Sequence, residues 1–267
     1  MGRPYHYFKY NKSRENKFTN IAHRGASAYY PENTLAAFEA AIELGADMVE
    51  FDVQLSRDGE VVVFHDEKIS RCTSGRGRIS DYALAEVKKL DAGSWFGNKF
   101  KGATIPTLHE TLAICKDKIA VNIEIKTEAV TDKTVGGIEE KCLKIVEQSG
   151  MRDHVIFSSF DPRAIKHLRE IESHAATAVL FEKKHYGKKL PSEIVTLLGA
   201  DCFNCSHKEL NKKWLEDLEV NGVSVNVYTV DAEKKIRRLL KAGVEGIFSN
   251  KPDVLKKTAD DFFRLGN

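Results

Sequence analysis

Short apolar segments typical of β-strands alternate with amphipathic segments typical of helices along almost the whole chain. The strand candidates are rich in Val, Ile and Phe, as strands buried on both faces of a parallel sheet usually are. They cover residues 20–23, 48–55, 60–65, 120–126, 155–160, 177–182, 202–206, 223–230 and 246–249. About eight strand–helix units predict right-handed crossovers and closure into a (β/α)₈ TIM barrel, an α/β fold, rather than an open sheet.

Residues that favour helix ends delimit the segments between these strands. Asn33-Thr34 opens a helix that stops at Gly45, and Asp161-Pro162 opens another, with Asp at the N-cap and Pro at the first helical position. The length of 267 residues matches the size of about 250 that is typical of one such barrel. Because no repeat or linker divides the chain, we expect a single domain over residues 1–267.

One segment breaks the alternation. Residues 66–106 contain a glycine- and arginine-rich stretch, Gly75-Arg76-Gly77-Arg78, and an expected short helix around 82–89. At roughly forty residues the segment is too long for a plain βα loop. We expect an insertion after the second barrel strand region that lies over the barrel mouth and is not a separate domain. The glycine-rich stretch does not lie between a strand and its helix, so it lacks the context of a phosphate-binding loop.

Charge and cysteine content exclude several classes of protein. The 41 basic and 39 acidic residues give a formal net charge of +2, which argues against a nucleic-acid partner because such proteins usually present a clustered basic face. The five cysteines are odd in number and scattered, as expected of reduced thiols in a reducing compartment. Cys202 and Cys205 have the spacing of a metal or redox pair, but in a strand they would face opposite sides.

The amino terminus, residues 1–20, is polar, basic and aromatic. We read it as an arm over the bottom of the barrel or as a leader. It lacks the apolar stretch of a secretory signal, and no later segment is apolar enough to span a bilayer. We therefore expect a cytoplasmic protein without stable membrane insertion. Nothing in the sequence indicates an oligomeric state.

Chemically active side chains gather at the ends of the first strand candidates. His23 and Arg24 end the first, and His65 ends the third. Glu50 and Asp52 are two residues apart, so they point to one side of the second strand while Phe51 points to the other. Glu124 and Lys126 repeat this spacing on the next barrel strand, so all of these groups should converge.

Three converging carboxylates, Glu50, Asp52 and Glu124, need a cation. Each like-charge pair at ~4 Å costs on the order of 4 kcal/mol at an effective dielectric near 20. Either the pKa values rise or a bound ion neutralises the charges. Oxygen ligands without cysteine favour Mg²⁺ or Ca²⁺ over zinc. The alternative is a set of solvated strand-end carboxylates, which the repeated spacing beside two histidines disfavours.

The two histidines suit proton transfer. Their unperturbed pKa of about 6.5 matches general acid–base work near neutrality, and cleavage of a phosphodiester needs both a proton acceptor and a proton donor. Arg24 offers a planar fork to a phosphate oxygen, and Lys126 a point charge to another. Together with a metal ion, these groups indicate a site for a phosphate ester.

These residues resemble the glycerophosphodiester phosphodiesterase family, and the resemblance runs from Ile21 to about Leu255. The segment 80–96 is also similar to the insertion of that family. The matching motifs are Ala22-His23-Arg24-Gly25, Pro31-Glu32-Asn33-Thr34, Glu50-Phe51-Asp52-Val53, Asp58-Gly59, His65-Asp66, Ile105-Pro106-Thr107-Leu108, Glu124-Ile125-Lys126, Ser158-Ser159-Phe160 and Phe248-Ser249-Asn250-Lys251-Pro252-Asp253.

The resemblance implies a (β/α)₈ barrel that hydrolyses a small-molecule glycerophosphodiester to glycerol 3-phosphate and an alcohol, with the adjacent glycerol hydroxyl as first nucleophile. Phe160 and Tyr228 would line the glycerol side, and family members often have Trp at the position of Tyr228. Glu32 would orient Arg24 or bind a glycerol hydroxyl. The remaining roles that the resemblance implies are metal binding by Glu50, Asp52 and Glu124, acid–base catalysis by His23 and His65, and phosphate contact by Arg24 and Lys126.

Two other functions remain open. A phospholipase D-type activity on lysophospholipids would use the same site and would need an apolar groove, which Trp95 and Phe96 are candidates to form. A non-catalytic barrel that binds a phosphate ligand would be expected to lack at least one catalytic group. The presence of both histidines and all three carboxylates argues against that second alternative.

Overall fold

The computed structural model describes residues 18–266. The arm that we expected at the amino terminus falls on residues 1–17, outside the described residues, apart from its last three. The prediction that the whole chain is one domain stays a prediction. No helix within residues 18–266 is both long enough and apolar enough to cross a bilayer.

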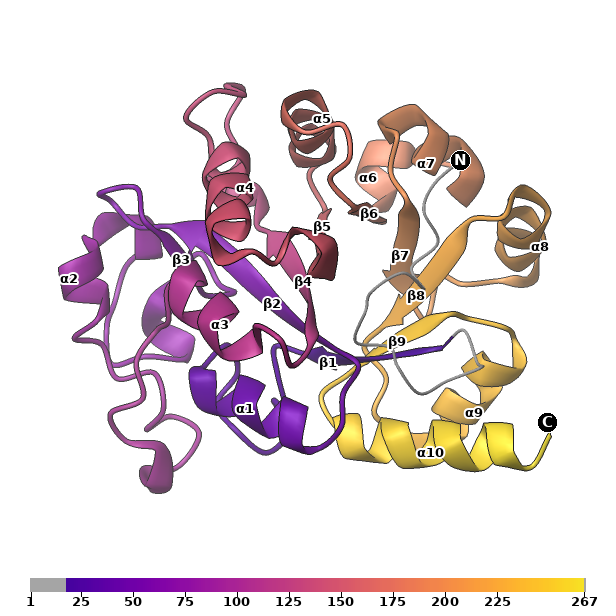
Figure 1. The fold of residues 1–267 in the computed structure, drawn as a ribbon, viewed down its shortest axis with the longest axis horizontal. Coiled ribbons are helices and arrows are strands. Elements are labelled where there is room, and N and C mark those ends of the chain that lie inside the picture. The colour runs from indigo at the N-terminus through magenta and orange to yellow at the C-terminus, as the bar shows by residue number, and fades with distance from the viewer. Residues whose placement is uncertain (1–17, 267) are drawn as a thin grey trace.

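Eight parallel strands close into a barrel, which confirms the predicted (β/α)₈ fold (Figure 1). Closure occurs because β1 pairs in parallel with both β2 and β9. The barrel strands are β1 (Thr19–His23), β2 (Met48–Leu55), β4 (Ala120–Ile125), β5 (Val155–Ser159), β6 (Thr177–Leu180), β7 (Cys202–Ser206), β8 (Ser224–Tyr228) and β9 (Gly246–Ser249).

The third strand candidate, 60–65, is not a barrel strand. It forms β3 (Val61–Val63), which pairs antiparallel with the end of β2. Asp58-Gly59 turns the chain back, and Gly59 adopts a φ of 83°, a left-handed conformation that glycine reaches without steric cost. His65 therefore reaches the site from the end of a hairpin rather than from a barrel strand.

Helices surround the strands (Figure 1). Two predicted caps are present: the Thr34 side chain accepts a hydrogen bond from the amide of Ala37, and Asp161 accepts one from the amide of Arg163. The helices are α1 (Leu35–Glu43), α2 (Leu84–Val87), α3 (Leu108–Cys115), α4 (Ile138–Ser149), α5 (Pro162–Ile171), α6 (Lys183–Tyr186), α7 (Pro191–Leu198), α8 (Lys212–Asn221), α9 (Glu233–Lys241) and α10 (Pro252–Arg264).

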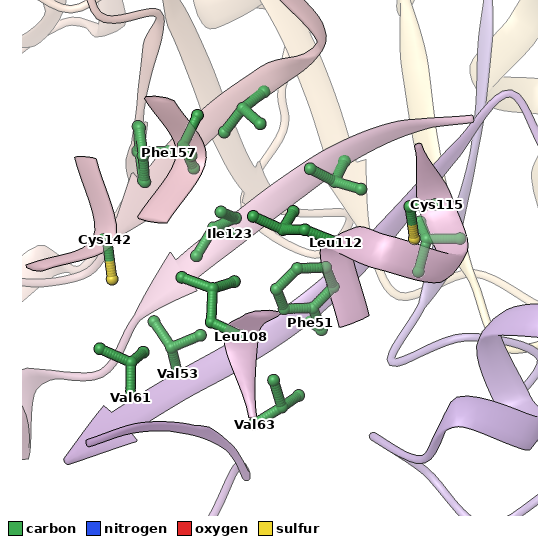
Figure 2. Packing of buried hydrophobic residues seen from close by; sticks show 14 of the residues in the cluster. Phe51, Val53, Val61, Val63, Leu108, Leu112, Cys115, Ile123, Cys142 and Phe157 are labelled. Carbon is green, nitrogen blue, oxygen red and sulfur yellow. The ribbon is translucent and has the colours of Figure 1, made fainter. Parts of the chain in front are cut away.

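The apolar layer between strands and helices orients the polar residues of β2 and β4. Phe51 and Ile123 point outward from these strands against Leu108 and Leu112 of α3, all fully buried (Figure 2). Because side chains alternate along a strand, Glu50 and Asp52 on either side of Phe51 must point into the barrel. The outer packing thus fixes the direction of the predicted metal ligands.

The insertion, residues 66–106, has a small apolar core of its own. It contains α2 and three 3₁₀ turns, Ile69–Arg71, Ile79–Asp81 and Asn98–Phe100. Its buried side chains pack with those of β3 and its flanks: Val62, Phe64, Ile69, Cys72, Ile79, Val87, Ala92 and Ile105. An ion pair of 2.8 Å between Arg57 and Glu86 of α2 also ties the insertion to the segment after β2.

All five cysteines are buried and unpaired with one another. Cys202 packs among side chains inside the barrel, while Cys205 packs in the layer beneath the helices. The two thiols face opposite sides of β7, as the sequence predicted, so they do not form a common metal or redox site.

Candidate active site

The register of three neighbouring strands brings the predicted ligands together. His23 of β1 pairs with Glu50 of β2, and Asp52 of β2 pairs with Glu124 of β4. The carboxylates of Glu50, Asp52 and Glu124 each offer an oxygen within 4.8 Å of the others. The predicted convergence of these three groups is therefore present in the structure.

The cluster has the chemistry of a site for a hard divalent cation. Glu50 and Asp52 are 2% and 1% exposed, and the Glu124 side chain is 12% exposed. One carboxylate oxygen of Asp52, Oδ1, is buried and accepts no hydrogen bond. Lys126 Nζ lies 3.4 Å from this oxygen without forming a hydrogen bond to it, so its lone pairs stay available to a further cation. Three carboxylates, one of which has an oxygen that accepts no hydrogen bond, fit a divalent cation that prefers oxygen ligands.

The pKa values of the three carboxyl groups diverge. Burial, with the nearby charge of Asp52, raises the pKa of Glu50 well above its usual range. Burial also raises the pKa of Glu124, against the opposing charge of Lys126. Burial acts upward on Asp52 too, but the charges of Lys126 and Arg24 outweigh it and lower the pKa of Asp52. Without a metal ion, Glu50 and Glu124 thus hold a proton more readily than solvated carboxyl groups do.

Both predicted cations lie beside the cluster. Lys126 Nζ is 2.8 Å from Glu124 and 3.4 Å from Asp52. Arg24 Nε is 3.4 Å from Asp52, and Arg24 Nη1 donates to Glu32 at 2.8 Å. The expected contact between Glu32 and Arg24 is thus observed. Burial acts downward on the pKa of Lys126, but Glu124 and Asp52 outweigh it, so the pKa is raised and the ammonium stays charged.

A left-handed turn after β1 delivers a backbone donor to the cluster. Arg24 has a φ of 54°, which is uncommon for a residue with a side chain, and its amide donates to Glu50 at 2.9 Å. Asn33, also left-handed at 57°, donates from its side chain to Asp52 at 2.9 Å. The turn therefore stabilises the ionised forms of two of the three carboxylates.

His23 is held by an amide. Its Nδ1 lies 2.7 Å from Oδ1 of Asn250, whose Nδ2 donates to Asp231 at 2.8 Å. Since Asp231 fixes the amide so that its oxygen faces the imidazole, His23 Nδ1 carries the proton and donates. In the neutral ring, Nε2 is then the proton acceptor. Burial and the charge of Arg24 lower the pKa of His23 to about 4.

His65 is held by a carboxylate. Its Nδ1 lies 2.6 Å from Oδ1 of Asp66, the next residue. Because a carboxylate only accepts, Nδ1 again donates, and Nε2 is left for other partners. Arg71 of the insertion donates two hydrogen bonds to the same carboxylate. Both imidazoles therefore use Nδ1 for a support residue.

A pocket of about 220 Å³ opens beside these groups. Phe160 and Tyr228 both line it, with ring centroids 6.0 Å apart and planes at 79°. Asp52, Lys126 and Glu32 are not among the residues that line it. The lining comprises His23, Arg24, Glu50, His65, Glu124, Ser158, Phe160, Leu180, Tyr228, Thr229 and Phe248.

Comparison with known proteins identifies the family of this chain. A sequence profile of the glycerophosphoryl diester phosphodiesterase family matches residues 23–254. The chain belongs to the glycerophosphoryl diester phosphodiesterase family. The matched segment contains every predicted site residue, from His23 to Tyr228.

Relatives in this family match over nearly their whole length. A glycerophosphodiester phosphodiesterase from Caldanaerobacter subterraneus subsp. tengcongensis is 40% identical over 236 residues, which are 88% of this chain and 95% of the relative. One from Bacillus subtilis is 33% identical, over 93% of this chain and 89% of the relative. A phosphodiesterase from Oleispira antarctica, solved in complex with the product sn-glycerol-3-phosphate, superposes with a TM-score of 0.79 at 30% identity, over 90% of this chain and 96% of that one.

Sequence reasoning missed several polar residues of this family member's site. Asn33 had no assigned role beyond a helix start and a motif position, and Asn250 none beyond a motif position, although each contacts a predicted site residue. Their position at the end of a barrel strand or its loop was the available signal. Asp231, which follows the strand candidate 223–230, carried the same signal, whereas Arg71 carried none. Trp95 and Phe96 pack edge to face at 5.5 Å and are not among the residues that line the pocket, so their part in a lysophospholipid groove stays a hypothesis.

Proposed function

We propose that the chain is a metal-dependent phosphodiesterase that hydrolyses glycerophosphodiesters to glycerol 3-phosphate and an alcohol. The observation that carries this proposal is the convergence of Glu50, Asp52 and Glu124 within 4.8 Å beside a pocket that two imidazoles line. The named activity of the relatives and the product bound to the Oleispira antarctica phosphodiesterase support the same substrate class.

Glu50, Asp52 and Glu124 would hold the divalent cation, Mg²⁺ or Ca²⁺. When bound, the ion supplies positive charge that offsets the carboxylates and polarises a phosphoryl oxygen. Arg24 and Lys126 add a guanidinium and an ammonium on either side of Asp52. These cations would bind the phosphate and stabilise the charge that develops as the phosphorus gains a fifth ligand.

The two histidines divide the proton transfers. His23, whose pKa is lowered to about 4, is neutral at pH 7 and accepts the proton of the attacking glycerol hydroxyl at Nε2. His65, whose Nδ1 is held by the carboxylate of Asp66 so that Nε2 is left for the substrate, gives a proton to the leaving alkoxide. The P–O bond to the alcohol breaks as the hydroxyl oxygen bonds to phosphorus, and water then opens the cyclic phosphate.

Phe160 and Tyr228 would receive the glycerol side of the substrate. Both rings line the same pocket as the charged groups, so the carbon chain would meet aromatic side chains while the phosphate meets cations. An intramolecular hydroxyl needs no separate positioning, which favours a glycerol diester over a simple phosphodiester.

The test is hydrolysis of a panel of glycerophosphodiesters by the purified protein. Glycerol 3-phosphate release is measured after chelator treatment and after return of Mg²⁺ or Ca²⁺. We expect activity only with a divalent ion. Release of choline from lysophosphatidylcholine, but not from glycerophosphocholine, would replace the proposed substrate class with lysophospholipids. Binding of glycerol 3-phosphate without turnover of any substrate would indicate a non-catalytic barrel.

A further inference from the structure

Arg71 uses its guanidinium to join two carboxylates that flank the pocket. Nη1 and Nη2 donate to the two oxygens of Glu32 at 2.9 and 2.7 Å. Nε and Nη2 donate to the two oxygens of Asp66 at 2.5 and 3.0 Å. A guanidinium is planar and presents its donors in a fixed fork, so two bidentate contacts hold both carboxylates in a defined relation to it.

Each of these carboxylates holds a residue of the pocket wall. Glu32 Oε1 accepts from Arg24 Nη1 at 2.8 Å, and Asp66 Oδ1 accepts from His65 Nδ1 at 2.6 Å. Arg24 and His65 line the pocket, whereas Arg71 does not. The carboxylate of Glu32 therefore lies between Arg71 and Arg24, and the carboxylate of Asp66 lies between Arg71 and His65.

Arg71 belongs to the insertion, in the 3₁₀ turn Ile69–Arg71, while Glu32 lies in the segment between β1 and α1. The neighbouring Ile69 and Cys72 are buried in the small core of the insertion, so the backbone that carries Arg71 is anchored there. The insertion thus presents a guanidinium, carried on an anchored backbone, to Glu32 of the barrel and to Asp66 at its own first position.

We propose that Arg71 is a positioning residue through which the insertion sets the orientation of both Arg24 and His65. The proposal rests on the phosphodiesterase function proposed above. Arg71 touches neither the pocket nor the carboxylate cluster, so it acts through Glu32 and Asp66. Removal of its side chain leaves two carboxylates without their common cation, and each is then free to rotate with the residue that it holds.

Substitution by lysine distinguishes a role that needs hydrogen bonds to both carboxylates from a role that needs only positive charge. Lysine keeps the positive charge of Arg71, but its single ammonium cannot donate two parallel hydrogen bonds to each of two carboxylates. Free guanidinium reproduces the fork without the covalent link. If Arg71 acts through its bidentate contacts, the activity of Arg71→Lys stays low and added guanidinium restores activity to Arg71→Ala. A role in charge or packing alone predicts that lysine suffices.

The experiment measures kcat and KM of the holoenzyme for a glycerophosphodiester in wild type, Arg71→Ala and Arg71→Lys. The matched control is Arg57→Ala, because Arg57 also ties the insertion to the barrel, through Glu86 and the carbonyl of Asp81, but contacts no pocket residue. Thermal unfolding is recorded for each variant, and kinetics are taken where all are folded.

We expect kcat to fall by about 100-fold in Arg71→Ala, the loss that a misplacement of about 1 Å causes, with a smaller change in KM. Millimolar guanidinium should recover part of kcat in Arg71→Ala only, and Arg57→Ala should keep the wild-type kcat. The proposal is overturned if Arg71→Ala or Arg71→Lys turns over like wild type, or if Arg57→Ala loses as much. An inactive wild-type holoenzyme would instead refute the proposed function, before any variant is compared.

Discussion

Several side chains of the site are each oriented by a second polar side chain. Asn250 holds His23, Asn33 holds Asp52 and Glu32 holds Arg24. Such support fixes tautomers and rotamers before a substrate arrives, which lowers the cost of reaching a reactive geometry. Losses of activity are therefore expected from residues that touch no substrate.

Asn250→Ala tests whether a support residue is needed to orient His23. Without its acceptor, the imidazole is free to turn and to change tautomer, so we expect kcat/KM to fall by about 10- to 100-fold, a loss typical of removing such a support residue. Asn211→Ala is the matched control, since Asn211 caps α8 and lies outside the pocket. It should cost about 1 kcal/mol of stability and leave kcat/KM unchanged. Equal kinetics in the two variants would contradict the role of Asn250.

Removal of either imidazole should abolish turnover. In His23→Ala and His65→Ala one of the two proton transfers loses its partner, and we expect kcat to fall by at least about 100-fold while circular dichroism stays that of the wild type. Near-normal activity in either variant would remove that histidine from the mechanism.

The titration of His23 is a separate check on the base. Burial and Arg24 lower its pKa to about 4, so the ring should stay neutral as pH falls through 6.5, the ordinary value. NMR of the metal-free protein, with the resonance assigned through His23→Ala, should give a midpoint near 4. A midpoint near the ordinary value would mean that the ring is not desolvated.

At the level of elements, the positions of the strands were predictable from the sequence, but the antiparallel direction of β3 was not. The two-residue spacing of Glu50 and Asp52 identified the inward face of β2, because alternation is a local property of a strand. β3 carries the same kind of apolar run as the barrel strands, so composition alone did not separate it from them. The turn at Asp58-Gly59 was the signal for a hairpin.

Phe51→Ala tests whether packing on the outer face of β2 holds the strand that carries Glu50 and Asp52. Phe51 is fully buried and packs 5.4 Å from Phe38, so its truncation should lower the free energy of unfolding by about 3–5 kcal/mol. Phe96→Ala, at a partly exposed aromatic of the insertion, should cost much less. Chemical denaturation gives both values, and similar losses would show that β2 is not held from its outer face.

At the level of the whole molecule, closure of the barrel creates contacts that local patterns do not encode. The alternation of strands and helices predicted the barrel, and repeated spacing predicted the three carboxylates. The contact between His23 and Asn250 joins residues 227 apart in sequence, and it exists because β1 pairs with β9. Arg71 likewise depends on how the insertion folds onto its neighbours, which no periodicity specifies.

The acidic cluster should make stability depend on metal and pH together. The raised pKa of Glu50 stabilises the metal-free fold at low pH, and this contribution is lost as pH rises through the folded pKa. A divalent ion replaces the proton, so its stabilising effect should grow with pH. At 100 times its Kd it contributes about 2.7 kcal/mol.

Thermal unfolding of chelator-treated protein checks this, with and without Mg²⁺. The rise in Tm on adding metal should be larger at about pH 8 than at about pH 5.5. In Glu50→Gln, which removes the titrating group, both the metal effect and its pH dependence should be reduced. A rise in Tm that is independent of pH would contradict the linkage.

The most direct test of the central claim is anomalous diffraction from crystals soaked in Mn²⁺, which takes oxygen ligands as Mg²⁺ and Ca²⁺ do. We predict one strong anomalous peak between the carboxylates of Glu50, Asp52 and Glu124, and its loss in Glu124→Gln crystals. No peak at that point, with Mn²⁺ bound elsewhere or not at all, would contradict the proposal that these strands share one divalent ion.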